Sequence, residues 1–303
     1  MSAAVPPRVA VVLVNWNNHA DTIECLESLG RSTYESRDVI VVDNGSRPES
    51  VDALRGGTGS ALLIESPVNL GFTGGNNLGI RTALDRHADL VFVLNNDTTV
   101  HPETISLLVG ALEDEPRAGI AAPKVRFFEP EDLIWYAGGT FSELTQNPVM
   151  TGYRQADDGR WDEPGEVEFA SGCAMLIRRG LLERLGGFSD EYFAVWEDVD
   201  FSRRARRAGY RILYVPGAVV WHKESASVGG NDAPRFVYYQ VRNRFLFLRR
   251  WARGPLIPVS AGFFAAAHLT KRSLAFALHR RWGALAAIGA GIAHGLAGRG
   301  GPR

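Results

Sequence analysis

Short, strongly apolar runs recur through the first third of the chain, and each ends in a polar cluster. The runs occupy residues 9–14, 39–42, 61–64 and 90–94. Runs this short and this apolar are typical of strands buried on both faces of a parallel sheet. The segments between them carry apolar residues at helical spacing. Strands that alternate with helices predict an α/β fold with a mostly parallel central sheet and right-handed crossovers.

Capping residues and prolines mark where the predicted helices begin. Asp21 and Glu24 stand at capping-box spacing, and Pro48 opens a short helix. A glycine-rich loop over residues 69–77 leads into a helix expected from Leu78 to about His87. Further elements are expected as strands at 119–125, 169–177 and 211–215, a helix at 179–185, and irregular structure with a hairpin at 127–168.

The polar clusters that end the first strands are expected at one edge of the sheet. Asn15, Asp43, the segment 69–77 and Asp97 each follow the C-terminal end of a strand. One such cluster is also what an ordinary polar turn looks like, but four on the same edge favour a binding site. Oxygen-rich side chains suit a hard divalent cation that takes its remaining ligands from water and phosphate.

Several other enzyme classes are excluded by the spacing of short motifs. The glycine-rich loop follows the third strand and lacks GxGxxG spacing, which argues against a dinucleotide-binding chain. Walker A, HExxH and GxSxG patterns are absent. Cys25 and Cys173 are isolated, and the N-terminus lacks a signal-peptide layout, so we expect a protein of the reducing cytoplasm without a zinc site.

A second acidic cluster opens a helix predicted after residue 196. Glu197, Asp198 and Asp200 begin it, and arginines end it before Gly209. These charges also suit the helix dipole, so the pattern alone requires no function. Because neighbouring residues on a helix point about 100° apart, only one of Glu197 and Asp198 can be the main catalytic base. His222 follows an apolar run and is a structural residue unless a metal lies nearby.

Together these segments resemble an inverting nucleotide-sugar glycosyltransferase of family 2 with the GT-A fold, and its bacterial rhamnosyltransferase-type members in particular. The resemblance covers about residues 8–250. It rests on six motifs in order: VVLVNWNN, VVDNGS, NLGFTGGNNLGI, LNNDT, ASGCAMLIRR and WEDVDFSRRARRAG. It implies a GT-A catalytic domain over residues 1–232, with a nucleotide-sugar half up to about residue 100 and an acceptor half at 101–232.

The resemblance also assigns roles to individual residues. Asp198 matches the catalytic base, with Glu197 as the fallback, and Asp97 and His222 would hold Mg²⁺ or Mn²⁺. Asn95 replaces the first acid of the family's DxD motif, which makes the metal site weaker. The residues expected to bind the donor are Asn15, Asn17, Asp43, Asn44, Gly71, Asn76, Asn77, Asn95 and Asn96. Gly172 and Trp196 would border the acceptor.

The implied reaction moves a sugar from a nucleotide-diphosphate donor to a glycan or polyprenyl-linked saccharide in cell-surface polysaccharide synthesis. A cation would stabilise the leaving diphosphate as a Lewis acid, and a carboxylate on the opposite face would take the acceptor's proton, so the anomeric configuration should invert. dTDP-rhamnose is the favoured donor. The alternatives are a UDP-hexose donor, or a nucleotide-sugar-binding scaffold without turnover; Asn95 keeps the scaffold open, whereas the intact Asp97 and Asp198 argue against it.

Residues 233–303 form a basic tail with eleven arginines, one lysine and no acid. That is about +12, and the whole chain's −1 leaves about −13 for residues 1–232. Arg235, Arg242 and Arg249 recur every seven residues beside apolar positions every three or four, which predicts a basic amphipathic helix. The apolar stretches 256–269 and 282–297 are shorter than the ~20 residues that span a bilayer.

We therefore expect this tail to hold the protein peripherally on the inner, anionic face of the cell membrane. The long apolar faces argue against nucleic acid as the partner. The alternative is a tail packed on the catalytic domain or on a second subunit of a homo-oligomer.

Overall fold

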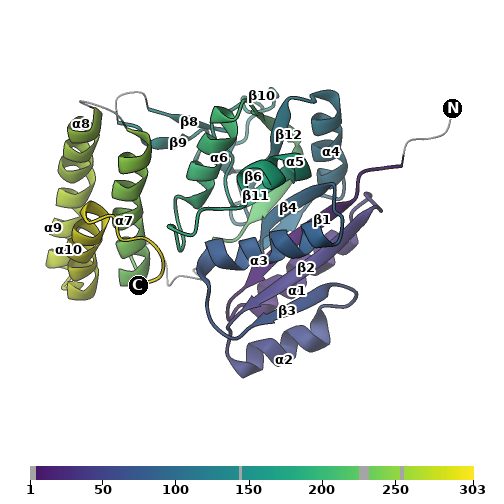
Figure 1. Ribbon diagram of the computed structural model, residues 1–303, viewed down its shortest axis with the longest axis horizontal. Helices are drawn as coiled ribbons and strands as arrows, with labels where there is room; N and C mark the ends of the chain where they lie inside the picture. The colour runs from purple at the N-terminus through teal and green to yellow at the C-terminus, as the bar shows by residue number, and fades with distance from the viewer. Residues whose placement is uncertain (1–4, 143–144, 225–231, 253–255) are drawn as a thin grey trace.

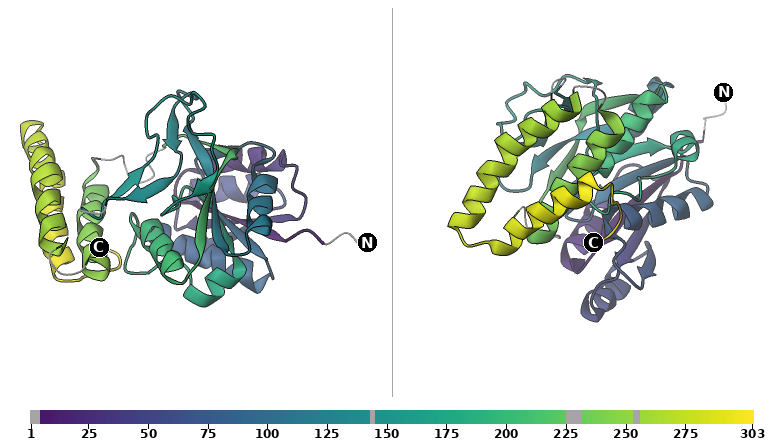
Figure 2. Two further views of the ribbon diagram at one scale, coloured as in Figure 1. Left: turned by 90° about the horizontal axis from the view of Figure 1, so that it is seen from above. Right: turned by 60° about the vertical axis from the view of Figure 1, so that its left-hand side comes forward.

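The computed structural model describes residues 5–142, 145–224, 232–252 and 256–303 (Figure 1). Its central feature is a twisted sheet of ten strands in the described part of the chain, with helices on both faces. The predicted α/β architecture is confirmed. A set of C-terminal helices stands beside this unit and forms a layer of its own, with α7 (Pro234–Trp251) nearest to the sheet (Figure 2).

The first half of the sheet is parallel and follows the sequence prediction closely. Its strands are β1 (Val9–Asn15), β2 (Arg37–Asn44), β3 (Leu62–Ser66) and β4 (Leu90–Asn95), in the order β4-β1-β2-β3. The crossovers are α1 (His19–Gly30), α2 (Pro48–Gly57) and α3 (Gly71–Asp85). Val11, Val12, Val41 and Phe92 are fully buried, as expected of strands covered on both faces.

The second half of the sheet mixes strand directions. Its strands are β5 (Thr98–Val100), β6 (Ala118–Phe127), β7 (Ile134–Tyr136), β10 (Gly165–Glu166), β11 (Ala174–Arg178) and β12 (Arg211–His222). The helices are α4 (Thr104–Asp114), α5 (Arg179–Leu185) and α6 (Glu197–Arg207). Strand β11 pairs antiparallel with both β4 and β6, while β12 runs parallel to β6. This arrangement brings distant parts of the chain to the ends of β4.

Three predicted boundaries were wrong, one of them at the strand expected at 211–215, which extends to His222 as β12. Helix α3 begins at Gly71, so most of the segment read as a glycine-rich loop is helical. Its glycines let the helix approach the sheet, since a Cβ at Gly79 would lie 2.3 Å from a Val12 methyl group. The strand expected at 169–177 covers only Ala174–Arg178. The backbone N–H of Gly172 leaves the sheet ladder and donates to the Asp198 carboxylate instead.

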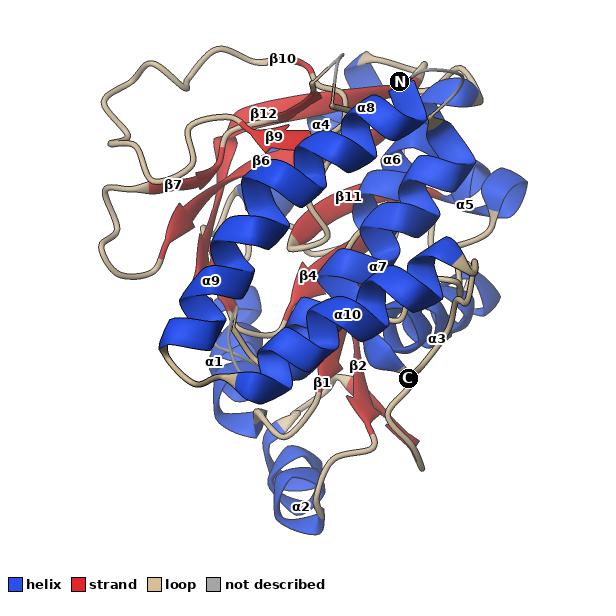
Figure 3. Cartoon of the chain, turned by 90° about the vertical axis from the view of Figure 1, so that its left-hand side faces the viewer, coloured by secondary structure: helices blue, strands red, loops and turns tan. Residues whose placement is uncertain are grey.

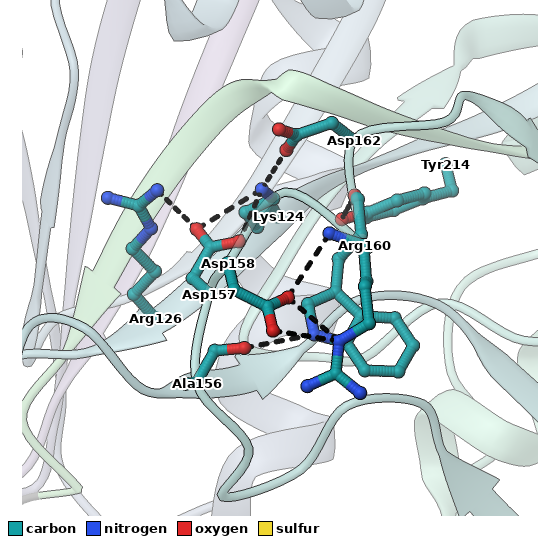
Figure 4. Close-up of polar contacts among 9 residues, drawn as sticks. Lys124, Arg126, Ala156, Asp157, Asp158, Arg160, Asp162 and Tyr214 are labelled. Carbon is teal, nitrogen blue, oxygen red and sulfur yellow. Dashed lines mark hydrogen bonds and ion pairs between the residues drawn. The ribbon is translucent and has the colours of Figure 1, made fainter.

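The long segment before β11 contains the predicted hairpin, formed by β8 (Gly139–Phe141) and β9 (Pro148–Met150). A buried ion-pair network fastens its following stretch to the sheet (Figure 4). Lys124 on β6 has a side chain only 2% exposed and bonds Asp157 at 2.9 Å and also Asp162. Arg126 pairs with Asp157 as well. The segment is irregular in backbone but held at a defined place.

The C-terminal region packs on the unit that contains the central sheet. It comprises α7, α8 (Leu256–Phe263), a π-helical segment η1 (Phe264–Leu269), α9 (Thr270–Leu278) and α10 (Trp282–Leu296). Helices α8 and α9 form one long rod through η1, and α10 lies against α7 (Figure 3). In the part of the chain that the structure describes, no helix has the length and apolar character needed to cross a bilayer.

Helix α7 exists as predicted, but its arginines do not form an exposed basic face. Arg242 is fully buried and donates to the carbonyls of Gly301 and Glu191, the latter at 3.1 Å. Arg249 donates to the Leu296 carbonyl at 2.7 Å. Arg242 therefore serves packing within the protein, which is the alternative that the sequence left open for this helix, whereas Arg235 has intermediate exposure and Arg249 is exposed.

Candidate active site

A cavity of about 380 Å³ opens at the C-terminal edge of β1 and β4. Seven of the residues predicted as donor- or metal-binding line it: Asn44, Gly71, Asn76, Asn95, Asn96, Asp97 and His222. The parallel strands end together at this edge, which is why residues from separate motifs meet there. Gly71 has a φ of +76°, and a Cβ at this position would lie 2.2 Å from the Phe193 carbonyl oxygen. A larger residue would not fit this corner of the cavity.

Strand pairing brings Asp97 and His222 together. Asp97 lies in the turn between β4 and β5, and the antiparallel pairing of β5 with β12 sets Thr98 opposite His222. The His222 Nε2 atom lies 3.2 Å from Asp97 Oδ1 and 3.3 Å from Asn95 Nδ2. Burial opposes the charged form of the ring, but Cys173 and the Asp97 carboxylate favour it, and the pKa of His222 lies well above its usual value.

This pair fits a cation that takes its other ligands from a substrate. Asp97 is 3% exposed and His222 is 6% exposed, and both face the cavity. The second ring nitrogen of His222 is buried without a hydrogen-bond partner. In the described ranges, no group of three or more His, Cys, Asp or Glu side chains could hold a metal. An oxygen-rich site with few protein ligands is what a diphosphate-bound Mg²⁺ or Mn²⁺ requires.

Asp198 is connected to the end of β4, close to Asp97, through the backbone of Gly172 and Cys173. The backbone N–H of Asn95 at the end of β4 donates to the Cys173 carbonyl at 2.8 Å. The preceding residue, Gly172, donates its N–H to Asp198 Oδ2 at 2.8 Å, and the Val199 N–H donates to Oδ1 at 2.7 Å. Burial raises the pKa of Asp198, and these two N–H groups oppose the rise. Asp198 is thus fixed beside the cavity wall formed by Phe72, whose ring also contacts the Gly172 position.

Glu197 has a different environment from its neighbour. Its side chain is 5% exposed, and the Oε2 atom is buried without a hydrogen-bond partner. Burial, with added repulsion from Asp198 and Asp200, holds the pKa of Glu197 well above its usual value. Of the two acids, Asp198 is the one whose oxygens are positioned by the backbone.

The chain enters helix α6 through a strained turn. Val195 and Trp196 have φ angles of +69° and +82°, which non-glycine residues rarely adopt. Asn243 on α7 is fully buried and donates to the carbonyls of Ala194 at 2.8 Å and Val195 at 2.7 Å. Strain of this kind persists only where surrounding contacts enforce it. Helix α7 therefore holds the turn that presents the two acids.

A polar network lies behind the cavity, at the ends of β1 and β2. Asn15 donates to Asp43 at 2.9 Å, and the Ser46 N–H donates to the second oxygen of Asp43. Asn17 accepts from the Arg47 N–H at 2.7 Å. Asn15 and Asp43 are almost fully buried. These residues shape the loops around the cavity, but they are not among its lining residues.

Five further predicted site residues are not among the residues that line the cavity: Glu197, Asp198, Gly172, Asn77 and Trp196. The Asn77 amide is used within the protein, because it donates to the Phe188 carbonyl at 2.9 Å and accepts from the Phe188 N–H at 2.9 Å. The Trp196 ring packs on Phe247 with 5.0 Å between ring centroids, facing α7. Gly172 sits under Asp198. The structure therefore brings Asp97, His222 and Asn95 together at the cavity. Asp198 lies at the Gly172 position that the lining residue Phe72 contacts, whereas the Asn77 amide is bonded to Phe188.

Several lining residues were missed from the sequence: Trp16, Trp135, Phe193, Glu224, Arg235 and Tyr239. Trp16 stands between the two predicted asparagines of the first motif, which was a usable signal. Arg235 and Tyr239 are four residues apart on α7 and therefore share a face of that helix. Trp135 and Glu224 gave no sequence signal; they meet through a 2.7 Å hydrogen bond from the indole N–H to the carboxylate.

A match to a protein-family model identifies the family of this chain. The model described as "Glycosyltransferase like family 2" matches residues 6–240, most of the chain. The chain belongs to glycosyltransferase family 2. This glycosyltransferase is 30% identical over 297 residues to the N-acetylglucosaminyl-diphospho-decaprenol L-rhamnosyltransferase of Mycobacterium tuberculosis H37Rv, covering 87% of its own length and 92% of that relative. It is 25% identical over 271 residues to the dTDP-rhamnosyl transferase RfbF of Shigella flexneri, covering 86% and 87%.

Solved structures with the same fold include sugar transferases. The mannosyltransferase PcManGT from Pyrobaculum calidifontis, in complex with GDP-Man and Mn²⁺, superposes with a TM-score of 0.57 at 19% identity over 97% of this chain and 88% of that one. GalNAc-T7 with UDP, GalNAc and Mn²⁺ gives a TM-score of 0.64 at 16% identity over 81% of this chain and 49% of that one. These matches confirm the GT-A fold predicted from the sequence.

Proposed function

We propose that this glycosyltransferase moves a sugar, with L-rhamnose from dTDP-rhamnose favoured, from a nucleotide diphosphate to a lipid-linked saccharide, with inversion at the anomeric carbon. The supporting observation is the cavity lined by Asp97 and His222; the backbone-held Asp198 lies outside the lining, at the Gly172 position that the lining residue Phe72 also contacts. The names of the two rhamnosyltransferase relatives, one acting on a decaprenol-linked substrate, support this donor and acceptor class.

Asp97 and His222 are the proposed ligands of a divalent cation, Mg²⁺ or Mn²⁺. Bound there, the cation would supply Lewis-acid stabilisation of the charge on the diphosphate. Asn95 stands where a second acid would add a ligand, and it contacts His222 instead. We expect that the diphosphate itself completes the coordination, so metal affinity in the absence of the donor should be weak.

Asp198 is the proposed general base, with Glu197 as the fallback. A base for a sugar hydroxyl works best when its pKa is raised toward the working pH, and burial raises the pKa of Asp198. Its two hydrogen bonds from Gly172 and Val199 orient the carboxylate. In the proposed step the acceptor oxygen loses its proton to Asp198 as it bonds to the anomeric carbon. No covalent sugar–protein intermediate forms.

The donor would lie along the edge of β1 and β2. We propose that Asn44, Gly71 and Asn76 contact it directly, because they line the cavity. Asn15, Asn17 and Asp43 would act from the neighbouring network, with Asp43 on the nucleotide base. Asn95 and Asn96 would border the diphosphate. For Asn77 the structure offers no free amide, so its proposed contact is the weakest of the set.

We further propose that the C-terminal helices contact the membrane that carries the acceptor. Leu274 and Leu278 on α9 are 62% and 72% exposed, and Trp282 at the start of α10 is 62% exposed. Leu274 and Leu278 share a helix face. Lys271 and Arg280 are exposed close to them in sequence. Exposed apolar side chains flanked by cations are typical of a surface that binds anionic lipid.

A donor panel tests the proposal. The protein is incubated with dTDP-rhamnose, UDP-glucose, UDP-galactose or GDP-mannose, a polyprenyl-diphosphate saccharide and Mg²⁺ or Mn²⁺, and nucleoside diphosphate release and product anomer are measured. We expect turnover with dTDP-rhamnose and inversion, lost on chelation and restored by either ion. Retention at the anomeric carbon would overturn the mechanism.

Asp198→Asn separates an enzyme from a binding protein. We expect this variant to lose transfer by ~10²–10⁴-fold and to keep nucleotide binding. A hexosyltransferase using UDP-hexose is the second candidate, since the chain is also 26% identical over 247 residues to the low-salt glycan biosynthesis hexosyltransferase Agl10 of Haloferax volcanii. A wild-type protein that binds nucleotide sugars but turns over none of the panel would support the scaffold alternative.

For the membrane contact, replacing Leu274 and Leu278 by Ser should reduce sedimentation with anionic liposomes.

A further inference from the structure

Arg235 is a cation held in the wall of the donor cavity. It lies in the first turn of α7 and lines the same cavity as Asp97 and His222. Its guanidinium carbon lies 4.8 Å from the ring centroid of Phe193 and 5.6 Å from that of Trp16. The Phe193 ring is itself stacked on Tyr239 at 5.1 Å. The two aromatic rings hold the guanidinium at the cavity wall.

The polar groups of Arg235 lack protein partners, unlike those of the other arginines of α7. Arg242, Arg244, Arg249 and Arg250 each donate to a carbonyl, hydroxyl or carboxylate group. Across the residues that the structure describes, Arg235 makes neither a hydrogen bond nor an ion pair. A guanidinium has five N–H donors in a planar fork that matches carboxylate or phosphate oxygens. A partly exposed cation in a cavity wall, with no acceptor among the described residues, is suited to bind an anionic ligand.

The anion is identified by what else the cavity contains. Asp97 and Glu224 also line it, and both are poor neighbours for a carboxylate ligand. A diphosphate is different, because a cation held by Asp97 and His222 would offset part of its charge. Asn95 supplies no carboxylate where the usual metal-binding motif has one, so the protein offers the cation one ligand fewer and the diphosphate has more need of another protein contact. The guanidinium of Arg235, carried by α7, can supply that contact.

We infer that Arg235 is a catalytic residue that binds the diphosphate of the donor and stabilises it as the leaving group; this inference rests on the proposed function. The bond between the anomeric carbon and the phosphate oxygen breaks, and its electron pair stays on that oxygen. The acceptor oxygen bonds to the anomeric carbon and its proton passes to Asp198. Negative charge on the leaving diphosphate grows during the step, and the fixed guanidinium is paired with it by charge-assisted hydrogen bonds.

Binding measurements test this role separately from turnover. Wild type, Arg235→Gln and Arg235→Lys are titrated by calorimetry with dTDP, UDP and GDP and with the matching nucleosides, in the presence of Mg²⁺ and without acceptor. We expect Arg235→Gln to weaken nucleoside diphosphate binding by about 10- to 100-fold and to leave nucleoside binding unchanged. Arg235→Lys should recover part of the loss, because it keeps the charge but lacks the planar fork.

Arg249→Gln is the matched control. It removes one positive charge from the same helix, fourteen residues further along or about 21 Å away, and should change neither affinity. Equal weakening of diphosphate and nucleoside, or unchanged diphosphate binding in Arg235→Gln, would overturn the inference. If Arg235→Gln turns over the preferred donor as fast as wild type, Arg235 is not catalytic although the proposed function stands. A wild type that binds no nucleoside diphosphate would overturn both.

Discussion

Replacing Asn243 by Ala should slow the enzyme more than it destabilises it. Asn243 supplies both hydrogen bonds that hold the Ala194 and Val195 carbonyls, and it does so from a fully buried position on α7. The two residues that follow Ala194 have positive φ angles, and they lead directly into Glu197 and Asp198. Loss of the amide lets this turn relax and moves the start of α6.

The magnitude follows from the bonds removed. A buried hydrogen bond contributes about 1–2 kcal/mol, so the two together supply about 2–4 kcal/mol of support to the strained turn. Relaxation of Val195 and Trp196 to ordinary dihedral angles returns about 1–3 kcal/mol each, which offsets much of the loss in global stability. The position of Asp198 is not restored by this relaxation. At about 1.4 kcal/mol per tenfold, kcat should fall by about 30- to 1,000-fold.

The assay compares kcat, KM for the donor and melting temperature in wild type and Asn243→Ala. Gln240→Ala is the matched control. It removes the hydrogen bond that the Trp196 indole N–H donates to Gln240 on the same helix, and it leaves the bonds to the two carbonyls in place. We expect a large fall in kcat, little change in KM and a small shift in melting temperature for Asn243→Ala only. Unchanged kcat, or a fall matched by an equal fraction of unfolded protein, would refute the reasoning.

Three further predictions concern buried charge. Burial raises the pKa of Glu197 in the folded state, so its cost to stability grows as the pH rises from the unfolded-state value of about 4.3 toward the folded-state value. Glu197→Gln should therefore melt at a higher temperature than wild type near pH 8, and the difference should shrink on acidification; a pH-independent difference would contradict this. Because burial raises the pKa of Asp198, kcat/KM should fall with decreasing pH at a midpoint above the usual aspartate value of about 3.9, as a pH–rate profile would measure. Lys124→Met removes one of the two cations paired with the buried Asp157 and leaves Arg126, so it should lower the unfolding free energy in urea by less than the ~3–5 kcal/mol of an unpaired buried charge, while the double variant with Asp157→Leu should regain part of the loss.

The first half of the fold was predictable because its determinants are local. Each strand of the parallel half is a short apolar run between polar turns, and the ends of such strands share one edge. Asp97 and His222 could be paired only through the resemblance to a known family, since the contact depends on β5 lying beside β12. The length of β12 and its irregular pairing with β6 after Val215 are tertiary features that no local pattern predicts.

Helix α7 shows the limit of reading a charge pattern. Arg235, Arg242 and Arg249 repeat every seven residues, as expected of an exposed basic face, yet Arg242 is fully buried. Arg244, which lies outside the repeat, is fully buried as well. They are tolerated inside because carbonyl oxygens accept their N–H groups, and sequence alone does not reveal those acceptors. The same holds for Asn77, whose amide matches the donor-binding motif but finds its partners at Phe188.

The contact between α7 and the cavity bears on how this enzyme can be shortened. Phe193 and Ala194, next to the acids, share one buried cluster with Val237 and Tyr239 of α7 and with Ala287 of α10. Truncation after residue 232 would strip away that cluster along with the charged tail. A trimmed protein that lost activity would thus say nothing about lipid, because the cut removes Arg235, Phe236 and Tyr239 from the lining of the cavity itself.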